Sequence, residues 1–588
     1  MKAFLLFPPS WTPAMPHLAL PTLTAYLRAH GLDVVQRDLN VEVKDEILTR
    51  HHLEETISRL REDYGPHARP GRSPRRRPDP AAGQWALNTG PQLALKVEEA
   101  KRVIRSESFF DGPTGQQALE TIAQGLQLAS LPFYPAALDL SSFTAASSEF
   151  RSRELLQAVR DPAQNPFLEI FRRGILADLQ RQPPDLVGIS IPSMAQLLAG
   201  LTLAALIKEA KLPCHITLGG PYLTVLREEL HQTPVLFDLF DSVILFAGEK
   251  PLLRLAEVLA AGGDPSQVPN LLYRDGGTIK ATALQEPETL TNLPPPDFHG
   301  LPLDKYLAPG LVLPLVTSRG CYHHKCAFCN VGYGAPDRFE QLPAESVVEQ
   351  MLHLQKSYPL RHIWFADEAI TPHNLRQMSP LLEKWGAPIE WSAYVRFDRA
   401  ISRELLESMY GGGCRMLFFG LESASPRIMQ AMQKGIELPV VKRILRDSAA
   451  AGFWNHLFFF FGFPGEMIED AQKTVDFLYA HKHYIHSAAF DIFVLELHAP
   501  VYRAAAQYGV KPIIRDPRDD LAMYFDYQVT SGMDEQTART VASRLLDALP
   551  KKEYAHFYVH DVYRILYASR LHQQGIPYPP WLEEGVMQ

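Results

Sequence analysis

Short apolar runs alternate with helix-like patterns in the first part of the chain. The stretches between the runs carry apolar residues at helical spacing, as in AQLLAGLTLAALIKEA. This alternation is typical of a parallel sheet covered by helices on both faces, so we predict an amino-terminal, doubly wound, Rossmann-like α/β domain over residues 1–280. The strand-like runs are KAFLLF at 2–7, LDVVQRDLN at 32–40, PDLVGISIP at 184–192, CHITLGG at 214–220 and DSVILFAGEK at 241–250.

Two segments interrupt or end this first series. Between about 45 and 180 the chain is helical or irregular, with a piece rich in proline and arginine at 66–83, and we predict that it is an insertion. Asp275-Gly276-Gly277 predicts a small hairpin. The proline-rich residues 281–309 then predict a linker between domains.

A second series of strand-like runs, each followed by a helical pattern, occupies residues 310–508. Six such units predict a partial (βα)6 barrel, in which functional residues lie at the carboxyl ends of the strands. We predict a helical carboxyl-terminal region at 509–588. The six runs are LVLPLVTSRG at 311–320, RHIWFADEAI at 361–370, IEWSAYVRF at 389–397, CRMLFFGLES at 414–423, WNHLFFFFGFPGE at 454–466 and SAAFDIFVLELHAP at 487–500.

Composition narrows the class of protein. The 588 residues include five cysteines, too few for a disulfide framework, and the net charge is −8. The basic run RSPRRRP at 72–78 is predicted to be a solvated loop, and the apolar run HLFFFFGF at 456–463 is too short to cross a membrane. With no leader pattern after Met1, we expect a cytoplasmic protein that binds neither nucleic acid nor membrane.

Three of the cysteines, Cys321, Cys326 and Cys329, follow the first strand of the predicted barrel within nine positions. They could hold zinc together with His323 or His324, they could form an unmetallated loop, or they could hold a [4Fe–4S] cluster with one iron left open for substrate. Zinc sites usually add a second pair of ligands far away in the sequence, and the other two cysteines are not paired. We predict that those two, Cys214 and Cys414, are buried structural thiols.

The cysteine loop resembles that of the radical S-adenosylmethionine (SAM) enzymes, which have an aromatic residue before the last of three close cysteines. Its first gap holds four residues, a length found among family members that also carry a cobalamin domain. FADE at 365–368, YVR at 394–396, GLES at 420–423 and FGFPGE at 461–466 resemble the family's later strand ends. The resemblance implies that the three cysteines hold a [4Fe–4S] cluster and that SAM binds at Phe328, Asp367, Arg396, Glu422, Gly462 and Pro464.

Each of these residues also has a structural alternative when it is considered by itself. Glu422 could cap the segment that follows it, Arg396 could form a surface ion pair, and Asp367 could end a solvated strand. Their order behind the cysteine loop favours the functional interpretation.

Glycines and serines at strand ends mark a second possible site, in the first domain. No G-x-G-x-x-G follows the first strand and no phosphate-binding G-x-x-x-x-G-K-[ST] occurs. GISIPS at 188–193 and LGGPY at 218–222 resemble cobalamin-binding domains, although a tight turn in a flavodoxin-like domain is the alternative. The resemblance implies that cobalamin binds at Ser190, Pro192, Ser193, Gly219, Gly220, Gly248 and Glu249.

The usual D-x-H-x-x-G that supplies a lower cobalt ligand is missing from the loop after the first strand. His17 lies in that loop without the flanking Asp and Gly, and we predict a structural or surface role for it. The absence fits the resemblance to cobalamin-dependent radical SAM enzymes.

Both resemblances together imply a cobalamin-dependent radical SAM C-methyltransferase. An electron from a flavodoxin- or ferredoxin-type donor would cleave SAM to a 5′-deoxyadenosyl radical, the substrate radical would take a methyl group from methylcobalamin, and a second SAM would restore it. A radical rearrangement, cyclisation or oxidation and a non-catalytic cobalamin- or zinc-binding protein are the alternatives. The substrate class stays open between a peptide, a natural-product intermediate, a tetrapyrrole and a lipid.

Overall fold

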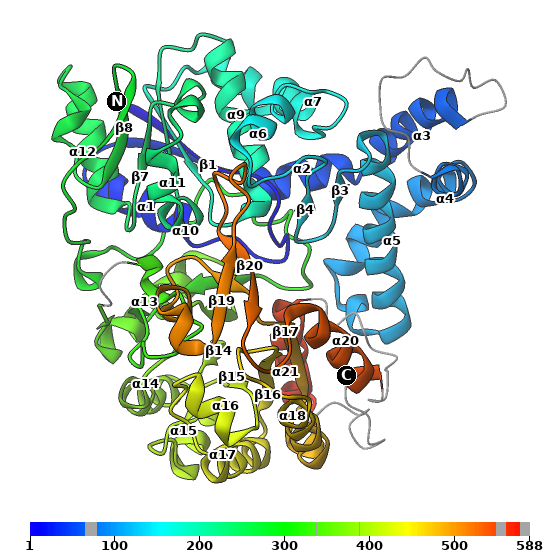
Figure 1. The fold of residues 1–588 in the computed structure, drawn as a ribbon, viewed down its shortest axis with the longest axis vertical. Coiled ribbons are helices and arrows are strands. Elements are labelled where there is room, and N and C mark those ends of the chain that lie inside the picture. Colours follow the sequence, from blue (N-terminus) through cyan, green and yellow to red (C-terminus); the bar gives the residue numbers. More distant parts are fainter. Residues whose placement is uncertain (65–78, 335–337, 387–388, 548–559, 577–588) are drawn as a thin grey trace. The chain divides into compact units, whose positions relative to one another are not determined.

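The computed structural model describes residues 1–64, 79–334, 338–386, 389–547 and 560–576 (Figure 1). The chain forms two compact units. The first contains Met1–Glu288, Asn292–Pro309 and Pro517–Ala522; the second contains Thr289–Thr291, Gly310–Asp516 and the described residues from Met523 onward. The basic run at 72–78 lies outside the described residues.

The centre of the first unit is a sheet that has seven strands within the described residues, in the order β2-β1-β5-β6-β7-β8-β9. The first five are parallel and the last two antiparallel, which confirms the predicted doubly wound sheet and the hairpin. The order reverses direction between β1 and β5, the switch point where open α/β sheets bind ligands. The strands are β1 Lys2–Phe7, β2 Asp33–Asp38, β5 Leu186–Ser190, β6 His215–Gly219, β7 Ser242–Ile244, β8 Leu271–Asp275 and β9 Thr278–Ala281.

Helices cover both faces of this sheet because its strands are apolar on both sides. Helices α1 (Ala19–Ala29) and α12 (Glu249–Ala260) share one core with β1, which includes Leu5, Leu27 and Leu255. Helix α9 (Leu197–Glu209) is buried along nearly its whole length and contacts α7 (Phe167–Phe171) of the insertion. Two short helices follow β6, namely α10 (Pro221–Val225) and α11 (Arg227–His231).

The segment between β2 and β5 is mainly helical. Helices α3, α4 and α5 pack against one another, and a small hairpin, β3 with β4, follows them. The elements are α2 Leu39–Ile47, α3 Arg50–Tyr64, α4 Pro80–Ile104, α5 Gly112–Ser130, β3 Ala137–Leu138, β4 Phe143–Thr144, α6 Ser152–Ala158, α7 Phe167–Phe171 and α8 Ala177–Arg181.

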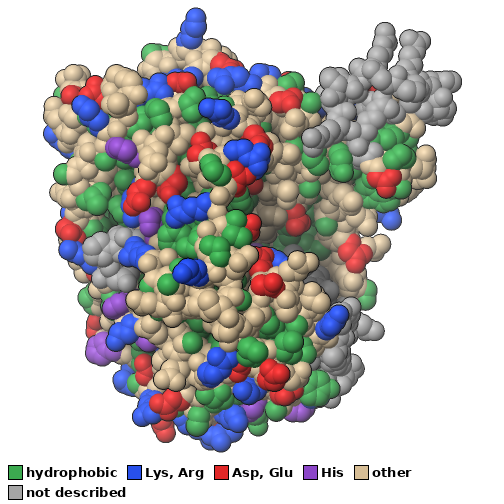
Figure 2. All heavy atoms as spheres, in the orientation of Figure 1, with side chains coloured by type: hydrophobic (Ala, Val, Ile, Leu, Met, Phe, Trp, Pro, Cys, Tyr) green, Lys and Arg blue, Asp and Glu red, His purple; other side chains and the backbone are tan. Residues whose placement is uncertain are grey.

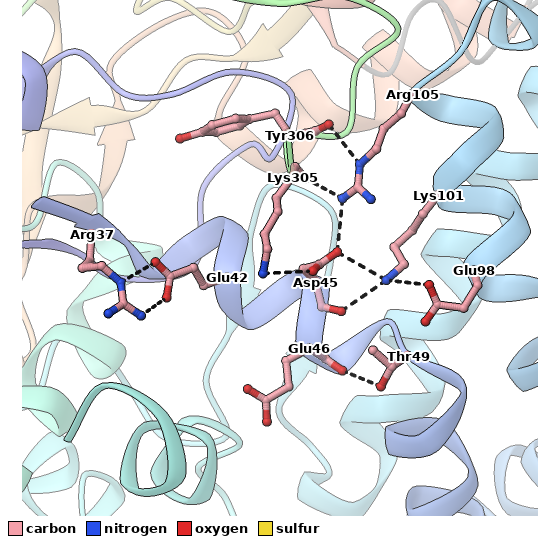
Figure 3. A network of polar contacts seen from close by, with 10 residues as sticks. All are labelled: Arg37, Glu42, Asp45, Glu46, Thr49, Glu98, Lys101, Arg105, Lys305 and Tyr306. Atoms are coloured by element: carbon pink, nitrogen blue, oxygen red, sulfur yellow. Dashed lines mark hydrogen bonds and ion pairs between the residues drawn. The ribbon is translucent and has the colours of Figure 1, made fainter. Parts of the chain in front are cut away.

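A charged network ties the insertion to the rest of the first unit (Figure 3). The carboxylate of Asp45 on α2 lies within 3.2–3.3 Å of cationic nitrogens on Lys101, Arg105 and Lys305. These cations lower the pKa of Asp45 although partial burial opposes them. Arg105 also donates to the carbonyl oxygens of Lys305 and Tyr306. The network therefore joins α2, α4 and the residue 305–306 segment.

The predicted linker at 281–309 needs a correction, because most of it packs on the first unit. Gln36 of β2 donates from Nε2 to the carbonyl oxygens of Asp297 and His299, and Tyr306 donates to Asp38 over 2.6 Å. Its prolines favour extended backbone, which here supplies carbonyl groups to the side chains of a sheet edge instead of spanning solvent.

The second unit is built on a sheet of parallel strands, six within the described residues, in the order β10-β13-β14-β15-β16-β17. Strand order follows chain order, which confirms the predicted partial (βα)6 barrel. The strands are β10 Val312–Leu315, β13 His362–Phe365, β14 Glu390–Tyr394, β15 Cys414–Glu422, β16 Trp454–Phe461 and β17 Ser487–Ile492. The helices between them are α13 Ala344–Ser357, α14 Pro372–Lys384, α15 Arg403–Gly411, α16 Pro426–Ala431, α17 Leu438–Ala451 and α18 Ile468–Ala480.

The carboxyl-terminal region is not purely helical, which corrects the prediction for 509–588. Strands β19 (Val510–Ile514) and β20 (Tyr524–Val529) form an antiparallel sheet with β18 (Leu495–Glu496) before α20 (Glu535–Asp547) begins. YFDYQV is rich in the aromatic and β-branched residues that strands favour, a local signal that the helical patterns around it obscured.

Helix α21 (Asp561–Gln573) packs against the barrel strands β14 and β15. Near the beginning of these strands, Ser569 of α21 lies 2.8 Å from Nε2 of His362 and donates to Glu390. Arg415 donates to the other oxygen of Glu390 over 2.7 Å. This buried polar group fixes α21 at the amino-terminal end of the barrel, opposite the end where chemistry is expected.

Surface charge agrees with the composition. Lysine, arginine and acidic side chains are interspersed over the face drawn in Figure 2, without a large basic patch among the described residues on that face. In the part of the chain that the structure describes, every helix is too short or too polar to cross a membrane.

Candidate functional site

The three cysteines lie on the loop that follows β10, at the carboxyl end of the barrel sheet. The loop begins with the two-residue strand β11 (Ser318–Arg319), which pairs with β12 (Glu340–Gln341). Gly320 follows with φ +80°, and a Cβ there would lie 2.5 Å from the carbonyl oxygen of Arg338. Only glycine fits this close approach, so the backbone conformation that leads into Cys321 is tightly constrained.

The four-residue gap between Cys321 and Cys326 has its own anchors. Nε2 of His323 lies 2.9 Å from the carbonyl oxygen of Gln433, and its ring covers Gly435, where a Cβ would lie 2.8 Å from the ring. The guanidinium of Arg396 lies 5.9 Å from the ring centre of Tyr322, a cation–π contact. The gap is thus attached at two places, to Arg396 just after β14 and to the residue 433–435 segment between α16 and α17.

The second half of the loop is held by backbone hydrogen bonds. The Ala327 amide donates to the Met432 carbonyl over 2.8 Å, and the Ala327 carbonyl accepts from the Val501 amide over 2.9 Å. Asn330 donates from Nδ2 to the Leu497 carbonyl over 2.8 Å. The cysteine loop is therefore clamped between residues 432–434 and residues 497–501.

All three cysteine side chains are half-buried and reduced. Burial raises the pKa of Cys326 and of Cys329, the latter to about 12, while Lys434 and Arg396 act in the opposite direction on Cys326. Cys326 lies close enough to Cys321 and to Cys329 for electrostatic interactions between the thiols. Nearby cations favour the thiolate form that metal ligands require.

The three thiols fit the donor set of a cluster, because thiolates are the usual ligands and each cysteine that holds a [4Fe–4S] cluster binds a different iron. In the described residues no three His, Cys, Asp or Glu side chains form a group that could hold a single metal ion.

Two predicted site residues, Glu422 and Arg396, meet beside the cysteine loop around a lysine that the sequence analysis did not select. Lys434 is buried, and its Nζ lies 2.7 Å from Oε1 of Glu422 and 5.8 Å from the ring centre of Phe328. Arg396 donates to the carbonyl oxygen of Lys434 over 2.6 Å. At Gly420 a Cβ would lie 2.3 Å from Glu422 and 2.7 Å from Lys434, so glycine allows this ion pair to form over the strand end.

Asp367 was predicted to bind SAM, and the structure gives it another role. Both of its carboxylate oxygens accept from the Thr317 amide at 3.0 Å, and Oδ1 also accepts from the Thr317 and Ser318 hydroxyls. The side chain is 5% exposed and faces the chain itself. Its neighbour Glu368 is exposed and acts on the pKa of Cys329, so Glu368 is the carboxylate on the side of the cysteines.

Three other predicted SAM residues lie near the end of β16. Phe328 is half-buried and packs edge-on against Phe460, with ring centres 5.0 Å apart. Gly462 has φ +87°, and its amide donates to Oε2 of Glu466 over 2.5 Å. Pro464 is buried in the same turn. The turn is thus adjacent to the cysteine loop, although the Gly462 amide already donates to Glu466.

In the first unit, the structure brings the predicted serine and glycine segments together. The Ile191 amide donates to the Gly219 carbonyl over 2.7 Å, and a Cβ on Gly220 would lie 2.5 Å from the Ile191 carbonyl oxygen. The close approach of the two backbone segments therefore requires glycine at position 220. Gly219 is half-exposed, and a Cβ there would make only ordinary van der Waals contact, 3.6 Å from the Ile244 carbonyl oxygen, so packing within the chain does not require glycine at this position.

Other predicted cobalamin residues lie at the same edge, with one exception. Ser190, Pro192, Ser193 and Gly248 are half-buried at strand ends. Glu249 is 5% exposed in the first turn of α12 and acts on the pKa of Tyr26, which places its carboxylate inside the domain. Glu249 therefore does not join the open edge.

His17 has a structural role, as predicted. Its ring stacks on Phe7 at 4.8 Å, and Nδ1 accepts from the Ala19 amide over 3.2 Å. Burial lowers the pKa of His17 to about 4, so the ring is neutral with its proton on Nε2. A protonated Nε2 is not a metal ligand.

The other lone cysteines differ from each other. Cys414 is buried, as predicted, but Cys214 is only half-buried, which corrects the expectation for it. Cys214 precedes β6 next to exposed Pro213, and the strand's apolar run begins only after it.

The family comparison supports the assignment of the second unit. Residues 315–478 match the model of the radical SAM superfamily. An uncharacterized methyltransferase of Pyrococcus horikoshii is 29% identical over 308 residues, which cover 51% of this chain and 65% of that protein. Bacteriochlorophyllide d C-12(1)-methyltransferase of Chlorobaculum tepidum is 24% identical over 276 residues, which cover 45% and 54%. The matches thus span less than two thirds of these relatives.

Solved structures match over a larger part of the chain. The radical SAM methyltransferase TsrM of Kitasatospora setae, solved with tryptophan substrate and a SAM analogue, aligns with a TM-score of 0.57 and 13% identity over 93% of this chain and 89% of that one. The cobalamin-dependent radical SAM enzyme OxsB, solved with aqua-cobalamin and SAM, aligns with a TM-score of 0.52 and 17% identity over 69% of each chain. Residues 315–478 are therefore a radical SAM domain, and the chain has the fold of the cobalamin-dependent radical SAM enzymes.

Proposed function

We propose that this protein is a cobalamin-dependent radical SAM methyltransferase that acts on an unactivated carbon of a small-molecule or peptide substrate. The observation that carries the proposal is the cysteine loop. Three half-buried thiols follow the first strand of a partial barrel, and the buried cation Lys434 lies beside them. The methyltransferase names of the two sequence relatives favour methyl transfer over the rearrangement, cyclisation or oxidation that the sequence also allows.

Cys321, Cys326 and Cys329 would hold a [4Fe–4S] cluster, which supplies an electron and an open iron for SAM when bound. Lys434 and Arg396 would balance the negative charge of the thiolates and the cluster. Glu422, Glu368 and the Gly462 turn lie next to the loop and would orient SAM. The reducing electron would come from a flavodoxin- or ferredoxin-type partner.

Cobalamin would bind at the carboxyl edge of the first sheet. The edge carries the strand switch between β1 and β5, and Gly219 at the end of β6 is half-exposed. Cobalamin would supply the methyl group, and the chain would position it without an imidazole from His17. Ser190, Pro192, Ser193, Gly220 and Gly248 line or shape the same edge.

The first test is to purify the protein anaerobically, to reconstitute it with iron, sulfide and hydroxocobalamin, and to count bound metals. We expect about four irons and one cobalt per chain. A Cys321/Cys326/Cys329→Ala variant should lose the iron and keep the cobalt. One zinc without cobalt would contradict the proposal.

The second test separates the kinds of chemistry. With a reductant and SAM, a radical C-methyltransferase consumes two SAM per turnover and forms 5′-deoxyadenosine and S-adenosylhomocysteine in equal amounts. Deoxyadenosine alone would indicate a radical reaction without methyl transfer, and S-adenosylhomocysteine alone would indicate polar methyl transfer through cobalt. Neither product would indicate a binding protein.

A further inference from the structure

A half-buried carboxylate lies directly beside the cysteine loop, and the chemistry proposed above does not use it. Glu496 ends the short strand β18, and its Oε1 accepts from Nδ2 of Asn330 over 3.2 Å. Asn330 immediately follows Cys329, and the same Nδ2 also donates to the Leu497 carbonyl. This contact holds Glu496 against the residue that follows a predicted ligand of the cluster.

The pairing of β18 with β20 determines the direction in which this carboxylate points. In the antiparallel pair Leu495 lies opposite Phe525, and Glu496 lies opposite Tyr524. Leu495 is buried in an apolar core that includes Ala327 of the cysteine loop, and Phe525 packs against the same core. Because successive side chains of a strand point to opposite faces, Glu496 and Tyr524 lie side by side on the other face.

Two exposed tyrosines flank the carboxylate. Tyr524 is its cross-strand neighbour, Tyr333 lies four residues after Cys329, and each tyrosine is 37% exposed. Burial raises the pKa of both phenols to about 12, with smaller contributions from nearby carboxylates that include Glu496. Both rings are thus accessible to a ligand and yet largely surrounded by protein.

In the described ranges of the chain no cation balances Glu496. Its hydrogen-bond partner there is the neutral Asn330, and no lysine, arginine or histidine of those ranges forms an ion pair with it. Burial raises the pKa of Glu496, and the hydrogen bond from Asn330 opposes the shift. A carboxylate that the protein desolvates without supplying a cation gains when a ligand brings one.

We propose that Glu496 binds a protonated amine of the substrate, with the rings of Tyr333 and Tyr524 beside the cation. The inference rests on the proposed function and names the substrate class, a molecule that carries an ammonium group. An ammonium donates charge-assisted hydrogen bonds to a carboxylate and is attracted by aromatic rings. Because Asn330 holds the carboxylate beside Cys329, the amine is anchored next to the cluster, and its distance along the substrate selects the carbon that reacts.

Paired variants separate the charge of the carboxylate and the aromatic rings from their structural roles. Glu496→Gln removes the charge and keeps an oxygen for Nδ2 of Asn330. Glu349→Gln makes the same change at an exposed position of α13 and is the matched control. Tyr524→Leu removes an aromatic ring, whereas Tyr524→Phe keeps it.

The assay is an NMR titration of the reconstituted full chain with SAM at a saturating concentration. The probes are phenethylamine and butylamine, each compared with the alcohol of the same carbon chain, 2-phenylethanol or 1-butanol. In the wild type and in Glu349→Gln, the amine of at least one pair should bind about tenfold more tightly than its alcohol. Glu496→Gln should abolish this preference. Tyr524→Leu should weaken amine binding about threefold, and Tyr524→Phe should leave it unchanged.

The outcomes distinguish this inference from the proposed function. Equal affinity for amine and alcohol in a wild-type chain that holds iron and SAM, or a preference that survives Glu496→Gln, would overturn the inference alone. Loss of iron in Glu496→Gln would show a structural role and would also overturn it. A wild-type chain that binds neither iron nor SAM would overturn the proposed function and this inference with it.

SAM is itself a cation, so its affinity is measured separately, without the probes. The dissociation constant of SAM should stay within twofold of the wild-type value in Glu496→Gln. A tenfold rise would show that the carboxylate serves SAM instead of the substrate, which would overturn the inference.

Discussion

The hydrogen bonds of Asp367 predict that this residue, although it does not face the cysteines, decides whether their loop forms. Its carboxylate accepts from the Thr317 amide, the Thr317 hydroxyl and the Ser318 hydroxyl at 2.6–3.0 Å, and these two residues lie four and three positions before Cys321. The perturbation is Asp367→Asn. The amide keeps one oxygen and presents an NH₂ group to the amide and hydroxyl groups that donate to Asp367.

The magnitude follows from the number of bonds lost. A hydrogen bond to a charged group contributes about 1.5–3 kcal/mol net. Asparagine can keep one or two of the contacts through its remaining oxygen, so the free energy of unfolding of the second unit should fall by about 2–4 kcal/mol. Burial raises the pKa of Asp367 to about 6, so the side chain is mainly ionised at pH 7.5, where the comparison should be made.

Calorimetry of the full chain and iron analysis after reconstitution are the assays. The transition of the second unit should shift by roughly 5 °C, and bound iron should fall because the loop no longer holds its three thiols in place. Glu368→Gln is the matched control: the residue is exposed, and the Thr317 and Ser318 donors bind Asp367 instead, so the transition should not move. A variant Asp367→Asn with unchanged transition and full iron content would refute the reasoning.

Three further predictions concern other buried groups. Glu390→Gln should destabilise the second unit by about 3–5 kcal/mol, because buried Arg415 loses its carboxylate; unchanged thermal unfolding would contradict this. Burial lowers the pKa of Lys44 to about 7, so between pH 7 and 9.5 the unfolded chain binds a proton that the folded chain does not. Stability in urea should therefore rise by about 1 kcal/mol per pH unit, and Lys44→Met should flatten this rise. His17→Gln should leave the Co(II) electron paramagnetic resonance spectrum of bound cobalamin unchanged, and a lost nitrogen splitting would show that the histidine binds cobalt.

Periodic patterns predicted the two sheets because buried parallel strands require long apolar runs. Every run that was assigned to the two parallel sheets became a strand in one of them. The residue 292–309 segment was not predictable in the same way. Its proline content suggests extended backbone equally in a linker and along a sheet edge, and only the partners Gln36 and Asp38 on β2 distinguish the two.

In the candidate site, too, the residue types could be predicted from the sequence, whereas contacts between residues far apart in the chain could not. The cysteines and Gly219 could be selected from the sequence because the chemistry proposed for them favours those residue types, and their roles stay predictions. The direction in which a side chain points could not be predicted from the sequence. Asp367 was therefore selected, although its neighbour Glu368 is the carboxylate on the side of the cysteines. Lys434 lies twelve residues beyond Glu422, and in the sequence only the MQKG turn marks it.

The inner face of the barrel indicates why radical chemistry would be confined to the cysteine end. Trp364, Tyr394 and Phe418 pack together there, with Tyr394 stacked on Phe418 at 4.6 Å. His560, the N-cap residue of α21, packs against Trp364. Buried groups seal the amino-terminal half, whereas Tyr394 stays half-exposed at the other end. A carbon radical abstracts hydrogen from whatever it meets, so its site must exclude solvent and position one substrate carbon. The packed aromatic side chains and helix α21 close the amino-terminal end of the barrel and so help to exclude solvent. Substrate selection is then left to the loops beyond the strand ends.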